Sequence, residues 1–226
     1  MKISQPSVHL VDFMGSDLSV VNAARVSFAK ESFWENEEQW LENDEPLRLS
    51  EKDQKLITYL AKHNHWSPFA HNSLTFRIKA PVFCARQMVK HQVGGVWNEV
   101  SRRYVDDEPE FYFPEVWRGK PTGNIKQGSE GEWHDTEIGA AYELLEDLVT
   151  TYKGMITRGC APEMARMLLP QCMMTEWWWT GSLMFFARVC KQRLDPHAQE
   201  ETRDIAKLIN ESIPKEFAHS WKALMT

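Results

Sequence analysis

An alternation of apolar and polar side chains over residues 74–80 constrains the fold more than any other feature of the chain. The apolar positions are Leu74, Phe76, Ile78 and Ala80, and the polar positions between them are Thr75, Arg77 and Lys79. A period of two places the two sets on opposite faces of an extended strand. The stretch therefore predicts a half-buried strand, followed by a helix that we expect to begin at Pro81 and to reach His91.

Helical spacing is the commoner pattern elsewhere. We expect helices from Ser16 or Asp17 to about Phe28, after a cap at Ser50, over 136–157, from Pro162 and from Pro196, and strands at 7–13 and 111–113. The acidic stretch 31–46 is expected to be a surface excursion. Gly, Pro, Asp and Lys crowd 118–131, which predicts a mobile loop. Helices thus predominate over a few strands, and the pattern predicts one α+β domain over 1–226.

Composition and charge exclude several classes of function. The 226 residues are 42% hydrophobic and 26% charged, which is enough apolar material for a core. The net charge of −6 argues against a general binder of nucleic-acid backbone. No stretch reaches the roughly eighteen apolar residues of a membrane span, and the first residues lack the apolar run of a signal peptide. We therefore expect a cytoplasmic protein with small-molecule partners.

Neither the cysteines nor a group of histidines forms a metal-binding pattern. Cys84, Cys160, Cys172 and Cys190 are widely spaced and include no CxxC pair, so we expect four reduced thiols. His63, His65 and His71 suggest zinc, but no cysteine or clustered carboxylate completes a site. A hydrogen-bonding role in a cofactor pocket is the better interpretation, and no metal site is expected.

The segment KHQVGGVWNEVSRRY, residues 90–104, gathers cations, amides, a carboxylate and aromatic rings around Gly94 and Gly95. Charge runs are usually solvated surface. The varied polar types and the paired glycines, which permit close backbone approach, favour a ligand site instead. Because the cluster is basic in an acidic chain, a phosphate is the simplest ligand.

Two further basic segments remain open to more than one interpretation. Arg166 follows Pro162 near an expected helix start, where it suits either an anion or a structural salt bridge. Arg193 and His197 would share a helix face, although Pro196 interrupts the spacing. The aromatic run EWWWTGS is typical of a core. Neither GxGxxG nor GxxxxGK[ST] occurs, so the sequence supports no dinucleotide fold or P-loop of those kinds.

Several ordered blocks resemble the flavin-dependent thymidylate synthases. NEVSRRY at 98–104, preceded by ARQMVKHQ at 85–92, is similar to the signature of that family. The other similar blocks, in the family's order, are ARVSF at 24–28, HNHWSPFAH at 63–71, FRIKAPVFCARQ at 76–87, ARMLLP at 165–170 and RLDPHAQ at 193–199. The resemblance covers most of the chain between about residues 8 and 205.

The resemblance implies a fold, a reaction and an assembly. It implies an α+β fold with a mainly antiparallel sheet and flanking helices, assembled as a homotetramer with active sites shared between subunits. The implied reaction makes dTMP from dUMP, with the methylene from methylenetetrahydrofolate and the electrons from NADPH through bound FAD. One segment that meets two phosphorylated, flat-ringed ligands would explain the composition of 90–104.

The resemblance also implies roles for individual residues. Those expected at dUMP are Gln87, Lys90, Glu99, Ser101, Arg102, Arg103, Arg166 and Arg193. Of these, Arg193 and Ser101 are the expected catalytic residues, with Arg193 stabilising negative charge on the pyrimidine near N3. Those expected at FAD are His65, Ser67, Lys90, His91, Gln92, Asn98, Glu99, Ser182 and Arg188.

The chain departs from the family pattern at a few of these positions. Lys90 and Gln92 stand where the family usually has arginine, and one extra residue lies between His91 and Asn98. Met184 falls where many members carry an arginine to the flavin. Because Arg188 lies one helical turn from Met184, we expect it to substitute for the missing guanidinium.

Two other functions are compatible with parts of this pattern. A flavin-dependent NAD(P)H oxidoreductase would use the same pocket without methyl transfer, but it would not need the residues expected to bind uracil nucleotide. A non-catalytic nucleotide-binding module would bind dUMP and purify without colour. Flavin absorbance and dUMP-dependent NADPH oxidation distinguish the three.

Overall fold

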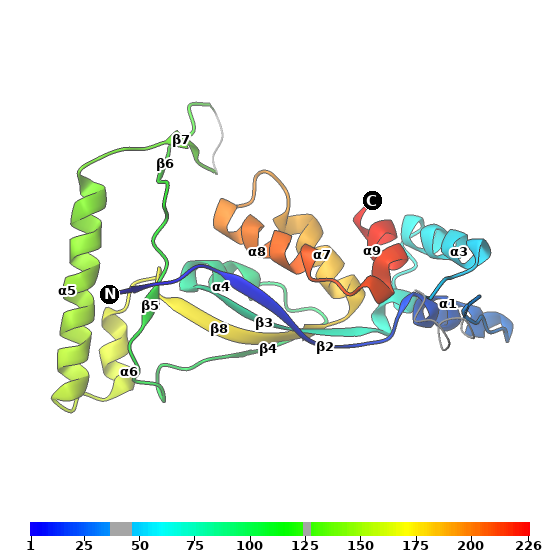
Figure 1. The fold of residues 1–226 in the computed structure, drawn as a ribbon, viewed down its shortest axis with the longest axis horizontal. Coiled ribbons are helices and arrows are strands. Elements are labelled where there is room, and N and C mark those ends of the chain that lie inside the picture. Colours follow the sequence, from blue (N-terminus) through cyan, green and yellow to red (C-terminus); the bar gives the residue numbers. More distant parts are fainter. Residues whose placement is uncertain (37–46, 124–127) are drawn as a thin grey trace.

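The core of the protein, described here by a computed structural model, is a four-stranded antiparallel sheet in the order β2-β3-β8-β4 (Figure 1). Its strands are β2 (Ser7–Met14), β3 (Ser73–Pro81), β8 (Met174–Gly181) and β4 (Gly95–Glu99). The structure describes residues 1–36, 47–123 and 128–226. The predicted single-domain α+β class with a mainly antiparallel sheet and flanking helices is therefore confirmed.

The alternation over 74–80 forms the strand that it predicts. Phe76 and Ile78 of β3 are fully buried, and Phe76 packs edge-on against Phe186 of α7 at 4.9 Å between ring centroids. Arg77 lies on the opposite face and pairs with Glu176 of β8. The neighbouring tryptophan run also lies in a strand, β8. As expected of a strand, its outer two rings are buried while Trp178 between them is 51% exposed.

Helices cover one side of this sheet and extend beyond its ends. They are α1 (Asp17–Arg25), α3 (Glu51–Lys62), α4 (Val82–Met88), α5 (Glu137–Thr157), α6 (Pro162–Ala165), α7 (Leu183–Arg193), α8 (Glu200–Glu211) and α9 (Ala218–Met225). Figure 1 shows α4, α7 and α8 together on one side of the sheet, and α1, α3 and α9 gathered at one end. As expected, Ser50 caps α3 by accepting a hydrogen bond from the Asp53 amide at 3.1 Å.

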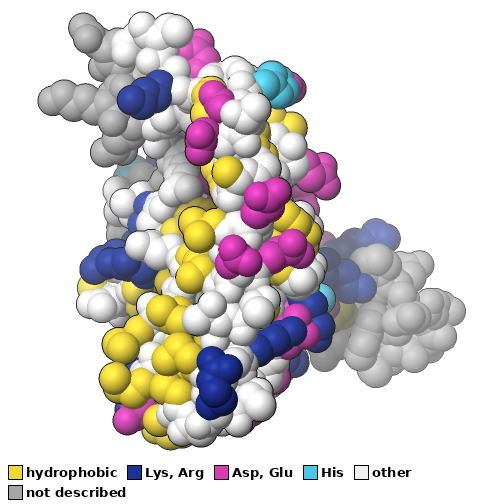
Figure 2. Space-filling model, turned by 90° about the vertical axis from the view of Figure 1, so that its left-hand side faces the viewer, with side chains coloured by type: hydrophobic (Ala, Val, Ile, Leu, Met, Phe, Trp, Pro, Cys, Tyr) yellow, Lys and Arg dark blue, Asp and Glu magenta, His cyan; other side chains and the backbone are white. Residues whose placement is uncertain are grey.

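The other end of the molecule is built from α5, α6 and short strands. β1 (Lys2–Ile3) pairs with β5 (Glu110–Phe111), and β6 (Arg118–Gly119) pairs with β7 (Glu130–Glu132). A small second core of Phe111, Leu145 and Val149 holds α5 in place. Figure 2 shows this end, where acidic side chains and hydrophobic ones are exposed side by side. Within the described ranges, no helix is long and apolar enough to cross a membrane.

Single-turn 3-10 segments connect several of these elements. They are η1 (Val26–Phe28), η2 (Ser67–Ala70), η3 (Arg166–Leu168) and η4 (Lys215–Phe217). The predicted helix to Phe28 therefore stops at Arg25 and tightens into η1. The predicted strand at 7–13, the long helix over 136–157 and the helix at Pro162 are confirmed.

Two predictions at proline are wrong. Pro81 remains in the sheet as the register partner of Met174, so it caps α4 instead of beginning it, and α4 ends at Met88. Pro196 does not open a helix, because α8 begins only at Glu200. The carboxylate of Asp195 accepts a hydrogen bond from the His197 amide at 2.8 Å, which holds this segment in a turn.

The remaining differences concern loops. The strand expected at 111–113 is β5, which ends at Phe111 because the Tyr112 amide turns away to donate to the Cys172 carbonyl. β6 and β7 pair within the stretch predicted as a mobile loop, whose residues 124–127 lie outside the described residues, as do 37–46 of the acidic stretch. The mobility of 118–131 stays a prediction.

Candidate active site

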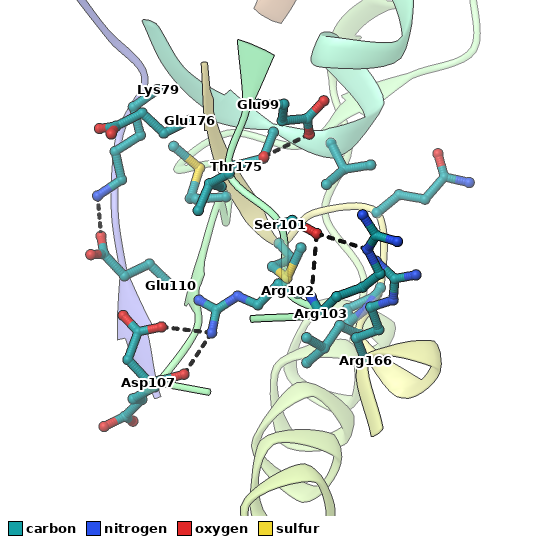
Figure 3. A pocket seen from close by; sticks show the side chains of 18 residues that line it. Lys79, Glu99, Ser101, Arg102, Arg103, Asp107, Glu110, Arg166, Thr175 and Glu176 are labelled. Atoms are coloured by element: carbon teal, nitrogen blue, oxygen red, sulfur yellow. Dashed lines mark hydrogen bonds and ion pairs between the residues drawn. The ribbon is translucent and has the colours of Figure 1, made fainter. Parts of the chain in front are cut away.

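A polar cavity of about 670 Å³ opens where β4 ends beside the start of β8 (Figure 3). It is lined by five of the residues predicted to bind nucleotide: Glu99, Ser101, Arg102, Arg103 and Arg166. Glu99 is the last residue of β4, the next three follow in the turn after it, and Arg166 comes from η3. The fold therefore brings two distant segments of the sequence to one cavity.

The carboxylate of Glu99 is fixed in direction by donors on rigid strands. Its Oε1 accepts a hydrogen bond from Thr175 Oγ1 at 2.7 Å, and its Oε2 accepts one from Trp97 Nε1 at 3.2 Å. Thr175 is buried on β8, and the Trp97 ring stacks on Trp177 with 4.3 Å between centroids. A carboxylate has about four lone-pair sites, so two remain for a ligand.

The cations of the polar cavity fall into a paired and an unpaired set. Arg102 Nη1 lies 2.8 Å from Asp107 Oδ1, and Lys79 Nζ lies 2.5 Å from Glu110 Oε2. Arg103 and Arg166 form no ion pair within the described ranges.

Figure 3 shows Arg102 turned toward Asp107, with Arg103 and Arg166 near each other on the other side. The Arg166 Nε donates to the Glu163 carbonyl, at 3.3 Å. The Arg103 Nε lies 3.4 Å from Ser101 Oγ. Two guanidinium groups without a carboxylate partner make this side of the cavity suitable for an anion such as a phosphate.

A second group of predicted residues meets where α7 ends beside α4, and we call it the Arg193 cluster: Arg193, His91 and Gln87. Arg193 Nε donates to His91 Nε2 at 2.9 Å, and its Nη2 donates to the Gln87 carbonyl oxygen at 2.9 Å. Because His91 accepts through Nε2, its ring is neutral and carries its proton on Nδ1. Burial, and then the charges of Arg193 and Arg188, lower the pKa of His91 to about 4.

The charge of Arg193 is held in place without being neutralised. Both of its partners in the cluster are neutral acceptors, and no carboxylate of the described residues pairs with it. Burial lowers the pKa of Arg193 from its usual value, with no acidic group opposing the shift. A positioned, half-buried guanidinium of this kind can stabilise negative charge that develops on a bound ligand.

A larger, mainly apolar cavity of about 1480 Å³ lies at the opposite end of β8, between α3, α7 and α9. Ser182, Met184 and Arg188 line it, two of which were predicted to contact the flavin. Ser182 Oγ accepts a hydrogen bond from the Phe185 amide at 3.2 Å and so caps α7. Arg188 Nη2 donates to the Val93 carbonyl at the cavity wall. Its size and lining suit a large ligand with flat, apolar parts.

Asn72 is a polar residue of this apolar cavity that sequence reasoning missed. It is 2% exposed, and neither its Oδ1 nor its Nδ2 has a hydrogen-bond partner among the described residues. A buried amide without partners costs about 1–3 kcal/mol. A ligand that offers a donor and an acceptor would remove that cost. The sequence shows an asparagine before a strand, but nothing in it reveals that the amide is buried and unpaired.

The two adjacent glycines of the 90–104 segment have different roles. A Cβ on Gly95 would lie 2.4 Å from the Phe185 ring, and one on its register partner Gly181 would lie 2.3 Å from the same ring. Gly95 therefore serves core packing. Gly94 has a φ of +86° and lines the apolar cavity, and its nearest neighbour would be Arg188 at 3.8 Å. Close approach of a ligand to the backbone is thus possible at Gly94 alone of this pair.

Comparison with known proteins places this arrangement in a family. Residues 9–217 match the family described as thymidylate synthase complementing protein. The chain belongs to this family. A flavin-dependent thymidylate synthase from Thermus thermophilus is 38% identical over 217 residues, which cover 96% of this chain and 74% of that protein. One from Thermosipho melanesiensis is 34% identical and covers 93% and 88%.

A solved structure agrees with the family assignment. The UMP/dUMP methylase PolB from Streptomyces cacaoi, bound with 5-Br dUMP, is similar to this chain with a TM-score of 0.81 and 29% identity. The likeness covers 99% of this chain and 96% of that one. The resemblance of the sequence blocks to flavin-dependent thymidylate synthases is therefore confirmed.

Within this member of the flavin-dependent thymidylate synthase family, one chain separates the residues predicted at dUMP. Glu99, Ser101 and Arg103 line the polar cavity, whereas Gln87 and Arg193 do not. Of the others, Arg102 is engaged by Asp107, and Lys90 is exposed just beyond α4. Their roles at the nucleotide stay predictions.

The residues predicted at the flavin are also spread out. His65 and Ser67 do not line the apolar cavity, although Trp66 and His71 beside them do. Two other residues predicted at the flavin lie outside that cavity: Gln92 is in the turn before β4, and Asn98 is on β4 opposite Trp178. Asn98 points to the other side of the strand from Glu99, since side chains alternate. Their roles stay predictions as well.

Burial raises the pKa of three of the four thiols of this thymidylate synthase relative. Burial raises the pKa of both Cys84 and Cys190 to about 12. Burial also raises the pKa of Cys172. In the described part of the chain, no three His, Cys, Asp or Glu side chains are grouped as metal ligands would be.

Proposed function

We propose that this chain catalyses the reductive methylation of dUMP to dTMP, with methylenetetrahydrofolate as carbon donor, NADPH as reductant and FAD as bound cofactor. Membership of the family and the likeness to a dUMP methylase support the reaction. The single observation that carries it is the set of unpaired guanidinium groups: Arg103 and Arg166 at the polar cavity and Arg193 in its cluster. Each is positioned by neutral groups and so keeps its charge for a ligand.

These residues suit the two ends of a nucleotide. Arg103 and Arg166 would bind the phosphate, for which an arginine without a carboxylate partner is well adapted. Arg193 would face the pyrimidine. C5 must become nucleophilic to take up the one-carbon unit, and a fixed guanidinium would stabilise the negative charge of the ring activated in this way. Ser101 Oγ lies in the same turn as Arg103 and would hold the nucleotide there.

The apolar cavity fits a flavin dinucleotide. Asn72 offers an unpaired donor and acceptor, Gly94 allows close approach, and Arg188 supplies a positive charge at the wall. Bound there, the flavin supplies the electrons that reduce the transferred methylene to a methyl group. The residues of the chain would bind and orient it, and the apolar walls would exclude water.

We also propose that the active site is shared in a homotetramer. The predicted dUMP residues fall into the polar cavity and the Arg193 cluster, and in one chain the cluster does not line the cavity. A second copy would bring its own cluster to the cavity. Light scattering of the active enzyme tests this, because a monomer that turned over dUMP would contradict the shared site.

Two assays test the proposed reaction. The purified protein should absorb near the wavelengths of oxidised flavin, and it should release tritium from 5-labelled dUMP only when methylenetetrahydrofolate and NADPH are present. NADPH oxidation that ignores dUMP would indicate an oxidoreductase without methyl transfer. A colourless protein that binds dUMP without turnover, even after FAD is added, would indicate a binding module.

A further inference from the structure

The turn that follows β4 is closed by an arginine next to the one proposed to bind phosphate. Within the turn, the Tyr104 amide donates to the Ser101 carbonyl at 3.0 Å. Arg102 Nη1 then reaches forward and donates to Asp107 twice, to its Oδ1 at 2.8 Å and to its carbonyl oxygen at 2.6 Å. Arg102 therefore ties the turn to the segment that leads into β5.

That segment is itself anchored to the body of the protein. Glu108 Oε1 lies 2.8 Å from Lys153 Nζ of α5, and Glu110 of β5 pairs with Lys79 of β3. Asp107 thus lies between the turn and two fixed points. Through its pair with Asp107, the turn is connected to a helix and to the central sheet.

Arg102 and Arg103 are adjacent in the sequence but have different surroundings. The Arg102 side chain is 13% exposed and faces Asp107, whereas Arg103 is exposed on the other side of the cavity (Figure 3). Arg103 Nε lies 3.4 Å from Ser101 Oγ, and its guanidinium carbon lies 5.0 Å from the centre of the Tyr104 ring. Both of these neighbours belong to the turn, so the direction of Arg103 depends on the shape of the turn.

We infer that Arg102 and Asp107 are positioning residues, which do not contact the nucleotide but hold the turn so that Arg103 meets its phosphate. The inference rests on the proposed function, and it replaces the direct contact expected of Arg102 from the sequence. Paired hydrogen bonds from a guanidinium to a phosphate require a fixed geometry, and a small displacement weakens them. The competing role is that Arg102 leaves Asp107 and binds the phosphate itself.

The substitution Asp107→Ala distinguishes the two roles by the sign of its effect. If Arg102 bound the phosphate, Asp107→Ala would release it, and the loss of a nearby negative charge would also favour an anion, so dUMP would bind more tightly. If Asp107 positions the turn, dUMP should bind about threefold more weakly in spite of that charge. Arg102→Ala also loses the bond to the main-chain carbonyl, and it should weaken dUMP about tenfold.

Asp106 provides a matched control for Asp107→Ala. It is the preceding residue and is also exposed, it forms no ion pair within the described ranges, and it is not among the residues that line the polar cavity. Asp106→Ala removes the same charge from the same loop, and the affinity for dUMP should stay at the wild-type value. The measurement is the dissociation constant of dUMP, by titration of the full-length, flavin-loaded protein.

A double variant tests whether Asp107 acts through Arg103. Arg103→Ala with Asp107→Ala should bind dUMP no more weakly than Arg103→Ala alone, because the positioned group is already gone. In the single variant Asp107→Ala, KM for dUMP should change more than kcat does.

Three results would overturn the inference: wild-type or tighter dUMP binding by Asp107→Ala, an equal loss in Asp106→Ala, or a full further loss in the double variant. The aspartates are exposed, so these variants decide the question even if Arg102→Ala does not fold. A wild-type protein that failed to bind dUMP would overturn the proposed function instead.

Discussion

At the start of β8 the polar cavity surrounds Glu99 with arginines, and at the end of the same strand the apolar cavity surrounds Asn72 with apolar walls. In the polar cavity, Glu99 already has two donors from the protein, so what is left unmatched is positive charge on Arg103 and Arg166. In the apolar cavity, what is left unmatched is a neutral amide.

The difference shows two ways of preparing a site on one sheet. Unpaired guanidinium groups at the surface are solvated by water, so leaving them without an anion costs little stability. The buried amide of Asn72 has no hydrogen-bond partner among the described residues, and such an amide lowers the stability of the empty protein until a ligand satisfies it. We therefore expect the polar cavity to determine charge recognition and the apolar cavity to determine shape and stability.

The largest effect should come from Arg193. Arg193→Ala should lower kcat about a hundredfold or more, because it removes one preorganised charge from developing negative charge, a change that costs on the order of 3 kcal/mol. Flavin content should be unchanged. Arg158→Ala, at the end of α5 and away from both cavities, is the control for loss of an arginine. Near-normal turnover of Arg193→Ala at saturating dUMP would remove Arg193 from the chemistry.

Arg103 and Arg188 allow a crossed test of the two cavities. Arg103→Ala should weaken dUMP about tenfold and leave FAD unchanged, whereas Arg188→Ala should weaken FAD about tenfold and leave dUMP unchanged, each through loss of a charged hydrogen bond. Titrations of both ligands against both variants give the four values. If each variant weakened both ligands alike, the cavities would not be separate sites.

Met184 sharpens the same test. Because Met184 and Arg188 both line the apolar cavity one turn apart, Met184→Arg should tighten FAD or leave it unchanged. Added to Arg188→Ala, it should recover part of the lost flavin affinity. Flavin binding that Arg188→Ala did not alter would show that Arg188 does not replace the arginine of other family members.

A smaller effect is expected from replacing Asn72, which should weaken FAD binding without lowering the stability of the flavin-free protein. Asn72→Leu should weaken FAD several-fold, yet the free energy of unfolding of the flavin-free protein should not fall, since the unsatisfied amide that costs about 1–3 kcal/mol is gone. Denaturant unfolding with and without FAD measures both. A flavin-free variant much less stable than wild type would mean that the amide has a structural partner.

The smallest effect on turnover should come from the buried cysteines. Cys84→Ser and Cys190→Ser should keep methylation activity, because thiols with a pKa of about 12 are not thiolates at neutral pH. Some stability should be lost from burying a hydroxyl. Cys160→Ser, at a partly exposed position, is the control. A variant that lost turnover but kept its fold, FAD and dUMP binding would require a thiol mechanism.

Local patterns made much of the fold predictable. The alternation of β3 and the Ser50 cap act over a few residues, so the chain displays them directly. β4 was missed because its glycine looks like a break, and its pairing with β8 is not visible locally. The helix predicted to begin at Pro196 was wrong because a proline can open a helix, but here the turn at Asp195 delays the start of α8.

By itself, the sequence determined the family, the principal helices and strands, and a set of residues for the site, because motifs and periodicity are carried by neighbouring positions. Only the tertiary structure decided which of those residues are available. Arg102 meets Asp107 a few residues away, while Arg193 meets, among the described residues, only neutral acceptors from α4 and the turn after it. Whether a side chain is paired depends on what the fold brings beside it, and that information is spread over the whole chain.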